Sequence, residues 1–214
     1  MKKKVTSPAN LLLALVGFLF LVSLAVTVTL NFKPLYYMDM KFLDIPGQSG
    51  YSAELIRENF DTLIEYNNIT YRGELHFTDM PMSESGRIHF EEVKAVFSVF
   101  EWMCIVSGTL FLAGAVVQCR RHDFGFFKAT AVGSIAIPVV LGVFVLSDWE
   151  NVFVQFHELV FNNDYWIFNP VTDPVITILP DTYFMHCALM IVLLVVLFSA
   201  ASWLIYRKMT QKKG

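Results

Sequence analysis

The chain has 214 residues, of which 55% are hydrophobic and only 16% charged, and its mean hydropathy is +0.52. This balance is too apolar for an ordinary water-soluble domain, so the composition predicts a membrane protein. The net charge of -3 lacks the basic excess of proteins that bind nucleic acid, which argues against nucleic acid as a partner.

Four stretches approach the ~20 mostly apolar residues that a helix needs to cross roughly 30 Å of hydrocarbon. The first follows three lysines and has an alternative interpretation as a signal peptide. It is longer than the roughly 7 to 15 apolar residues of a signal-peptide core, so we predict a retained span. The four predicted spans run from Pro8 to Phe32, Val93 to Val117, Phe124 to Leu146 and Phe184 to Tyr206.

Basic residues near the span ends indicate the orientation, because cytoplasmic loops retain an excess of Lys and Arg. Lys2 to Lys4, Arg120-Arg121 and the tail from Arg207 all fall on one side of the four spans. The segment from Lys33 to Glu92, on the other side, has eleven acidic and five basic residues. We therefore predict a multi-pass plasma-membrane protein with both termini in the cytoplasm.

The predicted fold is a mainly α, polytopic membrane protein with four transmembrane helices and a small extracytoplasmic α+β cap. The predicted order is a cytoplasmic N-terminus and first span at 1–32, the cap at 33–92, the second span at 93–117, a cytoplasmic loop at 118–123, the third span at 124–146, an extracytoplasmic loop with an interfacial helix at 147–183, the fourth span at 184–206 and a cytoplasmic tail at 207–214.

The cap is expected to contain one amphipathic helix and one short strand. Apolar residues from Leu55 to Ile64 lie near one face of a helix, and Ser52 is its candidate N-cap. The next segment, ITYRGELHF at 69–77, is rich in β-branched and aromatic residues in rough alternation, which predicts a strand or a hairpin arm.

A second amphipathic helix is expected after the third span. The segment DWENVFVQFHELVF at 148–161 repeats apolar residues at helical spacing, which indicates a helix along the membrane interface. The following Asn162-Asn163-Asp164 is predicted to end it. Trp166 lies among aromatic residues that fit an interfacial belt or contacts with lipid.

Two histidines lie in polar clusters on the predicted outer side. His89 precedes the second span and has Glu92 at i+3, where the two side chains can share a helix face. His157 is followed directly by Glu158. Because histidine exchanges protons near neutral pH, we predict that these two imidazoles meet in an active site at the membrane surface. The remaining histidines, His76, His122 and His186, are predicted to be structural.

Several catalytic motifs are absent from the sequence. It has no GxSxG elbow, no HExxH and no Walker-type glycine loop, and its three cysteines form no CxxC pair. We predict neither a cofactor nor a metal. A zinc ion held by His89, Glu92 and His157, as in a metal-dependent hydrolase, stays open as an alternative.

Two segments resemble the lipoprotein intramolecular transacylase family of monoderm bacteria. They are HFEEV at His89 to Val93 and FHELVFNNDYWIFNPVTDPVITILP at Phe156 to Pro180. The likeness extends to the layout of four spans with a large outer first loop. In the family an Asp is common where this chain has Glu92.

The resemblance implies an intramolecular acyl transfer. The family moves the sn-2 acyl chain of the diacylglyceryl group on a lipoprotein's N-terminal cysteine to that cysteine's own α-amino group. The product is an N-acyl lipoprotein of the lyso form. The family's two catalytic histidines fall on His89 and His157, and the implied partners are the diacylglyceryl-modified lipoprotein N-terminus and membrane lipid.

Histidine suits this reaction. The attacking amine has an ordinary pKa of about 8, so a base with a pKa near 6.5 is well matched to it. Direct attack closes an eight-membered ring, so the substrate carries its own nucleophile. One imidazole is expected to be the base and the other to stabilise the oxyanion or protonate the leaving oxygen, with their assignment open. Glu92 or Glu158 is expected to orient an imidazole.

Asn163, Trp166 and Asp173 complete the predicted supporting residues, although Asn163 and Asp173 are also explained as turn residues. A different class of function also stays open. In that alternative the chain is a non-enzymatic membrane sensor or partner protein, whose outer cap binds protein and whose histidines tune structure or respond to pH.

Overall fold

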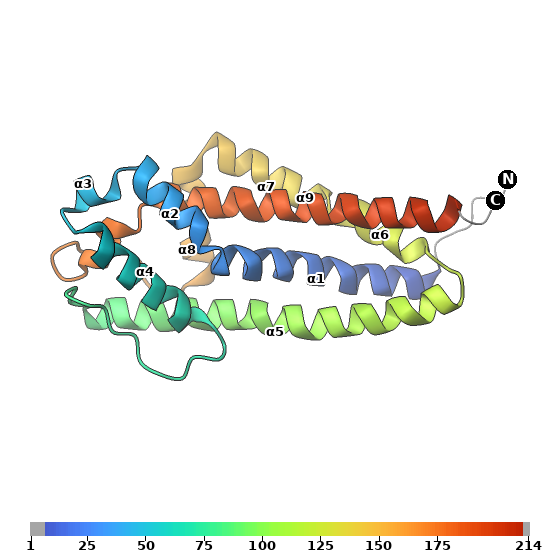
Figure 1. Cartoon of the computed structure of the whole chain (residues 1–214), viewed down its shortest axis with the longest axis horizontal. Coiled ribbons are helices and arrows are strands. Elements are labelled where there is room, and N and C mark those ends of the chain that lie inside the picture. Colours follow the sequence, from blue (N-terminus) through green and yellow to red (C-terminus); the bar gives the residue numbers. More distant parts are fainter. Residues whose placement is uncertain (1–6, 212–214) are drawn as a thin grey trace. The chain divides into compact units, whose positions relative to one another are not determined.

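The structure is a computed structural model that describes residues 7–211, apart from the side chain of Ile137. Its internal contacts divide the chain into two compact units, and Figure 1 follows the chain through both from blue to red. Unit 1 contains the chain up to Thr27, Phe100–Val143 and the chain from Leu189 onward. Unit 2 contains Val28–Val99 and Phe144–Ala188.

Four helical stretches are long and apolar enough to cross a membrane, in agreement with the sequence prediction. α5 has 37 residues, well above the ~20 that a span requires, so part of this helix extends beyond the hydrocarbon. Its charged first turns are the part that fits the aqueous side. The four stretches are α1 (Pro8–Asn31), α5 (Glu84–Arg120), α6 with α7 (Gly125–Ser147) and α9 (Asp181–Gln211).

The third span is interrupted between α6 (Gly125–Gly133) and α7 (Ala136–Ser147). Pro138 explains the position of the break, because a proline cannot donate a hydrogen bond to the carbonyl four residues earlier and its ring clashes there. That carbonyl belongs to Ser134, where α6 has ended.

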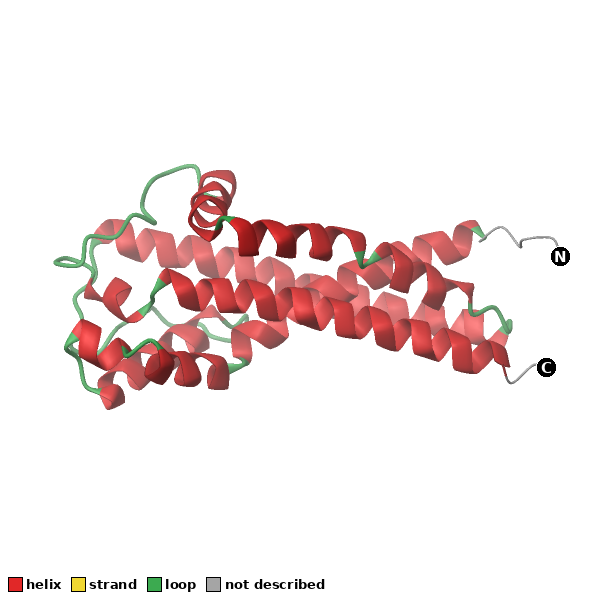
Figure 2. Cartoon of the chain, turned by 90° about the horizontal axis from the view of Figure 1, so that it is seen from above, coloured by secondary structure: helices red, strands yellow, loops and turns green. Residues whose placement is uncertain are grey.

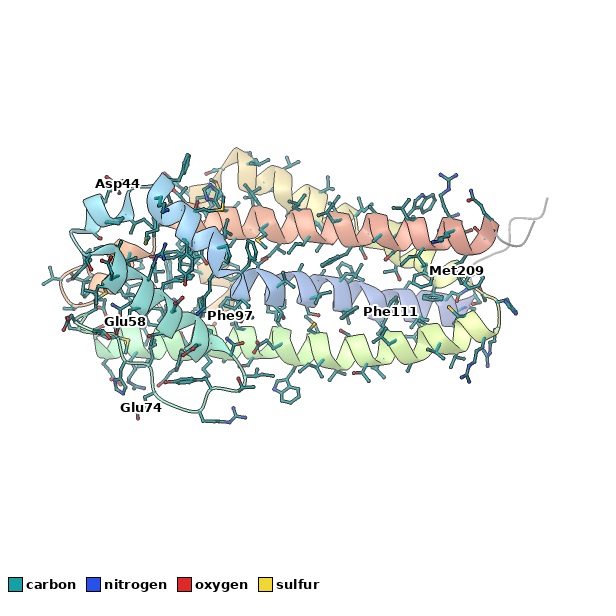
Figure 3. All side chains as sticks on the ribbon, in the orientation of Figure 1. Asp44, Glu58, Glu74, Phe97, Phe111 and Met209 are labelled. Atoms are coloured by element: carbon teal, nitrogen blue, oxygen red, sulfur yellow. The ribbon has the colours of Figure 1, made fainter. Side chains whose placement is uncertain are left out.

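Aromatic rings and a buried polar network hold unit 1 together. Phe111 of α5, labelled in Figure 3, has its ring centroid 6.1 Å from that of Phe20 and 5.8 Å from that of Phe126. At one end Asn10 accepts a hydrogen bond of 2.7 Å from Gln118 and donates one of 2.9 Å to Asp123. These contacts connect α1, α5 and the connector that precedes α6.

Unit 2 is built around stacked aromatic side chains. Tyr36 stacks on Phe60 at 3.6 Å between centroids, Tyr183 meets Tyr36 edge-on at 5.1 Å, and the Tyr36 hydroxyl donates to the Ile178 carbonyl at 2.7 Å. The unit therefore gathers helices from distant parts of the chain. Besides the last residues of α1 and α7 and the first turns of α5 and α9, they are α2 (Lys33–Phe42), α3 (Ile45–Ser49), α4 (Ala53–Asn67), α8 (Trp149–Val160) and the 3₁₀ helix η1 (Pro174–Ile178).

The two predicted amphipathic helices are present. α4 has Ser52 as its N-cap, whose hydroxyl oxygen accepts from the Leu55 N–H at 3.2 Å, and the helix ends at Asn67. α8 is capped by Asp148, whose carboxylate accepts from the Asn151 N–H at 3.3 Å, and it ends before the Asn162-Asn163 turn.

The predicted strand at 69–77 is wrong. Within residues 7–211 the chain forms helices and loops and no strand, as Figure 2 shows by colour. A lone extended segment has no ladder to join. Instead, the buried Asn59 accepts from the Thr78 N–H at 2.7 Å and donates to its carbonyl at 3.0 Å, and Lys94 donates to the Tyr71 carbonyl. The cap is therefore helical with a long loop, and it is not an α+β structure.

Candidate active site

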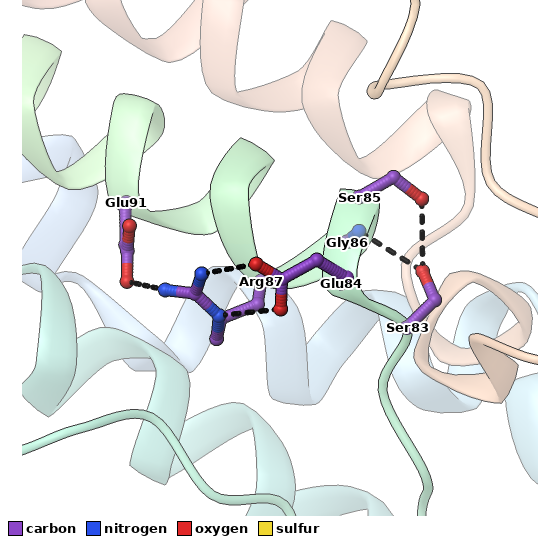
Figure 4. A network of polar contacts seen from close by, with 6 residues as sticks. All are labelled: Ser83, Glu84, Ser85, Gly86, Arg87 and Glu91. Carbon is purple, nitrogen blue, oxygen red and sulfur yellow. Dashed lines mark hydrogen bonds and ion pairs between the residues drawn. The ribbon is translucent and has the colours of Figure 1, made fainter.

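The first turn of α5 is fixed by a serine cap and a buried carboxylate. The Ser83 hydroxyl accepts from the Gly86 N–H at 3.0 Å (Figure 4), and the Ser83 N–H donates to Asp173 Oδ1 at 2.7 Å. A Cβ on Gly86 would lie 2.3 Å from that same oxygen, so only glycine allows the carboxylate to come so close. Thr172 donates to the other oxygen of Asp173 at 2.7 Å. Asp173, a predicted supporting residue, thus holds the start of the helix that carries His89.

The exposed face of the same turns carries only surface charge. Figure 4 shows Arg87 between Glu84 and Glu91, with which it forms ion pairs. Such exposed i,i+3 and i,i+4 pairs contribute little to stability. His89 lies on another face and is buried, with 5% of its surface exposed.

His157 is placed in the last turn of α8 with 9% of its surface exposed. Its Nδ1 lies 2.7 Å from the Phe153 carbonyl oxygen. A carbonyl can only accept, so Nδ1 is the donor and carries a proton. In the neutral imidazole Nε2 therefore holds the lone pair.

The structure brings the two histidines together within unit 2. Their ring centroids are 6.1 Å apart with an angle of 32° between the planes. Trp166 stacks on His157 at 4.7 Å, and Phe161 lies 4.8 Å from His89 and 5.7 Å from His157. Phe168 meets His89 edge-on at 5.4 Å. The imidazoles thus sit among aromatic rings that exclude water from much of their surface.

Burial governs the electrostatics of His157. Loss of hydration disfavours the imidazolium and lowers the pKa of His157, while the hydrogen bond to the Phe153 carbonyl raises it by a smaller amount. The net direction is downward from the ordinary value of about 6.5, so His157 is neutral at pH 7. A neutral imidazole is the form that can accept a proton.

The predicted carboxylates differ in their surroundings. Asn163 donates from Nδ2 to Glu92 Oε1 at 2.8 Å, which connects α5 to the loop after α8. Asn163 also accepts from the Tyr165 N–H at 3.0 Å, so it sets a turn as well. Glu158 is exposed and has no polar contact among the described residues, and it is not brought to the imidazoles.

The remaining histidines lie elsewhere. His186 at the start of α9 pairs with the buried Asp39 of α2 at 2.8 Å, and His76 forms an exposed pair with Glu74. His122 lies in the connector after α5 with a positive φ of 54°. Across the described part of the chain, no group of three or more His, Cys, Asp or Glu side chains is placed to hold a metal ion.

Sequence reasoning missed several residues that contact the imidazoles or cap the helix that carries His89. Phe153 offers its backbone carbonyl, which no side-chain pattern reveals, although its place four residues before His157 on a helix is a usable signal. Phe161 and Phe168 were visible only as generic interfacial aromatics. Ser83 lies in the connector between cap and span, and its capping role could have been found from its place three residues before Gly86.

Comparison with known proteins identifies the family. Residues 11–184 match the family model described as lipoprotein intramolecular transacylase Lit. Among solved structures, the membrane integral lipoprotein intramolecular transacylase Lit from Bacillus cereus is 31% identical, with a TM-score of 0.94 over 96% of this chain and 95% of that chain. Two structures of the same protein, with one histidine replaced by arginine or by alanine, give TM-scores of 0.87 over 96% of this chain.

A comparison with curated proteins finds no match. The family match covers far more than half of the chain, and the solved relative matches it almost from end to end. The chain belongs to the lipoprotein intramolecular transacylase family.

Proposed function

We propose that this protein transfers the sn-2 acyl chain of a diacylglyceryl-cysteine to the α-amino group of the same cysteine. Membership of the transacylase family carries the reaction class. The observation that carries the site is the buried pair His89 and His157, whose rings lie 6.1 Å apart. The product is an N-acyl lipoprotein with a free glyceryl hydroxyl.

The substrate supplies the attacking group, so the protein needs no nucleophile of its own. The amine nitrogen attacks the ester carbonyl carbon through an eight-membered ring. As the C–N bond forms, the nitrogen loses a proton and an oxyanion develops. The C–O bond to the glyceryl group then breaks, and its oxygen takes up a proton. Holding amine and ester in contact contributes several kcal/mol through orientation alone.

His157 is the base in this proposal. Its Nδ1–H is committed to the Phe153 carbonyl, which leaves the Nε2 lone pair for the proton of the amine. The Phe153 carbonyl then stabilises the imidazolium of His157. The Trp166 ring, which stacks on the imidazole, stabilises the same cation through a cation–π interaction. The proton on Nε2 is afterwards available to the departing glyceryl oxygen, as in hydrolases that use one histidine for both steps.

His89 is the donor that stabilises the oxyanion in this proposal. Its Nδ1 is buried and has no hydrogen-bond partner among residues 7–211. A ring N–H of His89 can donate to the oxyanion as it develops, in a site where few water molecules compete. Asp173 and Asn163 act through position, because they fix α5 and the loop after α8 on either side of the imidazoles.

The proposal includes the location of the site. The side of unit 2 that carries both histidines is the extracytoplasmic face, and both termini are cytoplasmic. The support is the charge pattern, with basic residues at Arg120 and Arg121 and in the tail and acidic residues in 33–92. On this face the site meets lipoproteins that have already received a diacylglyceryl group, together with the membrane lipid around them.

Replacement of either histidine tests the mechanism. His89→Ala and His157→Ala are each expected to slow acyl migration by roughly 10²- to 10⁴-fold, the usual contribution of a positioned acid or base. The assay uses purified protein and a synthetic diacylglyceryl-cysteinyl peptide with a free amine, and mass spectrometry reads the position of the acyl chain.

His76→Ala is the matched control, since that side chain is exposed and pairs only with Glu74. Near-normal product from either site variant would remove that histidine from the mechanism. No N-acyl product from the wild-type protein would overturn the proposed function itself.

A further inference from the structure

Glu92 has a buried oxygen that the described chain does not satisfy. Its Oε1 accepts from Asn163, but Oε2 is buried and has no hydrogen-bond partner. Among the ion pairs of residues 7–211, none involves Glu92. A carboxylate oxygen without water or donor is expensive to bury, so this atom requires a partner that enters from outside.

The position of this oxygen connects it to the imidazole pair. Glu92 follows His89 by three residues on α5, where two side chains lie on adjoining parts of one helix face. Its partner Asn163 belongs to the same loop as Trp166, which stacks on His157. His89 Nδ1 is unpartnered as well, so one short stretch of α5 presents two buried polar atoms that lack internal partners.

Contacts inside the chain argue against the predicted role of Glu92 as the orienter of an imidazole. His157 Nδ1 is oriented by the Phe153 carbonyl, and His89 Nδ1 has no hydrogen-bond partner within the described residues. Because the Glu92 carboxylate orients neither imidazole, its negative charge is available to bind a ligand. The hydrogen bond from Asn163 to Oε1 holds the carboxylate in place and leaves Oε2 as the acceptor.

A primary ammonium group fits this acceptor. At neutral pH the substrate's α-amino group is mostly protonated, because its ordinary pKa is about 8, and it then carries three N–H donors and one positive charge. We propose that Glu92 Oε2 binds this α-ammonium group, which loses one proton to water before the neutral amine attacks, and so selects substrates with a free N-terminus. This inference rests on the proposed function. It adds a charged subsite that receives the amine beside the base.

Binding of unreactive ligands tests the subsite separately from catalysis. Two synthetic lipopeptides carry ether-linked chains that cannot migrate, one with a free α-amine and one N-acetylated. The wild-type protein in detergent micelles is expected to bind the free amine at least about tenfold more tightly, in the range that a charge-assisted hydrogen bond supplies. In Glu92→Gln, which keeps an oxygen for Asn163, the two ligands should bind equally.

Glu91→Gln is the matched control, because Glu91 is the neighbouring carboxylate on the exposed face and pairs with Arg87. It should keep the wild-type preference for the free amine. Equal binding of both ligands by the wild type, or a preserved preference in Glu92→Gln, would overturn the inference. A Glu92→Gln protein that loses both ligands equally would also overturn it, since that result indicates a structural role. Acyl transfer by the wild type on an ester substrate is measured in parallel, so the proposed function stands or fails independently.

Discussion

The Nδ1 atoms of His157 and His89 differ in their hydrogen bonding. His157 has Nδ1 bonded to a backbone carbonyl, so its proton-accepting atom is defined before any substrate arrives. His89 Nδ1 has no partner in the part of the chain that the structure describes, so its hydrogen bond can be made to a reacting group. The proposal gives the two histidines different roles because their Nδ1 atoms differ in hydrogen bonding.

The lowered pKa of His157 predicts how the fold responds to acid. In the unfolded chain the imidazole titrates near 6.5, whereas in the folded protein it titrates lower. The unfolded state therefore binds more protons between these two values, and stability falls as the pH drops through that window. We expect the difference between melting temperatures at pH 7.5 and pH 5.5 to be smaller in His157→Gln than in wild type.

Thermal unfolding followed by intrinsic fluorescence in detergent measures this difference. His76→Gln serves as the control, because an exposed histidine should leave the pH dependence unchanged. Identical pH dependence in wild type and His157→Gln would contradict the assignment of a lowered pKa.

At the scale of elements, the long loop after α4 depends on one buried amide. Asn59 has no exposed surface and bonds both backbone groups of Thr78, whereas the neighbouring Glu58 bonds only the exposed Thr78 hydroxyl. We expect Asn59→Ala to release the loop from α4, because the loop loses both hydrogen bonds to Asn59, each of which contributes about 0.5–1.5 kcal/mol to the free energy of unfolding. Trypsin should then cleave faster after Arg72.

Glu58→Ala is the control for that experiment, because its exposed hydrogen bond contributes little and cleavage after Arg72 should stay near the wild-type rate. A loop equally resistant in Asn59→Ala would show that the loop is held by other contacts, such as the hydrogen bond from Lys94 to the Tyr71 carbonyl.

The elements that were predictable from sequence are those with local signals. Apolar length identified the four spans, and a serine cap with helical spacing identified α4. The strand prediction for 69–77 was wrong because β-branched and aromatic residues favour a strand only where a partner strand exists. α2 was missed because its apolar residues pack against distant elements, as Tyr36 does against Phe60 and Ile178.

The candidate site was predictable in its residues but not in its contacts. His89 and His157 are 68 positions apart, and their proximity depends on how α8 and α5 pack, which no local pattern specifies. The same holds for Asp173 and Ser83, whose hydrogen bond spans 90 positions. Polar residue types beside helices suggested the candidates, and the tertiary structure determined which of them meet.

For the whole molecule, the proposed orientation has a direct test. Cys104, Cys119 and Cys187 are replaced by serine, and single cysteines are introduced as Glu74→Cys or Arg121→Cys. We expect a membrane-impermeant maleimide to label the first variant in intact cells, because the proposed orientation turns unit 2 outward. It should label the second only after permeabilisation, because the charge pattern predicts a cytoplasmic position for Arg121. The reverse pattern would invert the proposed topology and place the histidines inside the cell.

The hydrogen bond from His157 to the Phe153 carbonyl, with the indole of Trp166 against the ring, has a consequence for how protons travel. Turning the imidazole over would break that bond and disturb the stack, so the ring stays in one pose throughout a turnover. In the proposed mechanism, the Nε2 atom that accepts the proton from the amine is then the same atom that delivers it to the departing oxygen. No tautomer exchange or ring rotation has to intervene, and the relay is back in its starting state as soon as the acyl chain has moved.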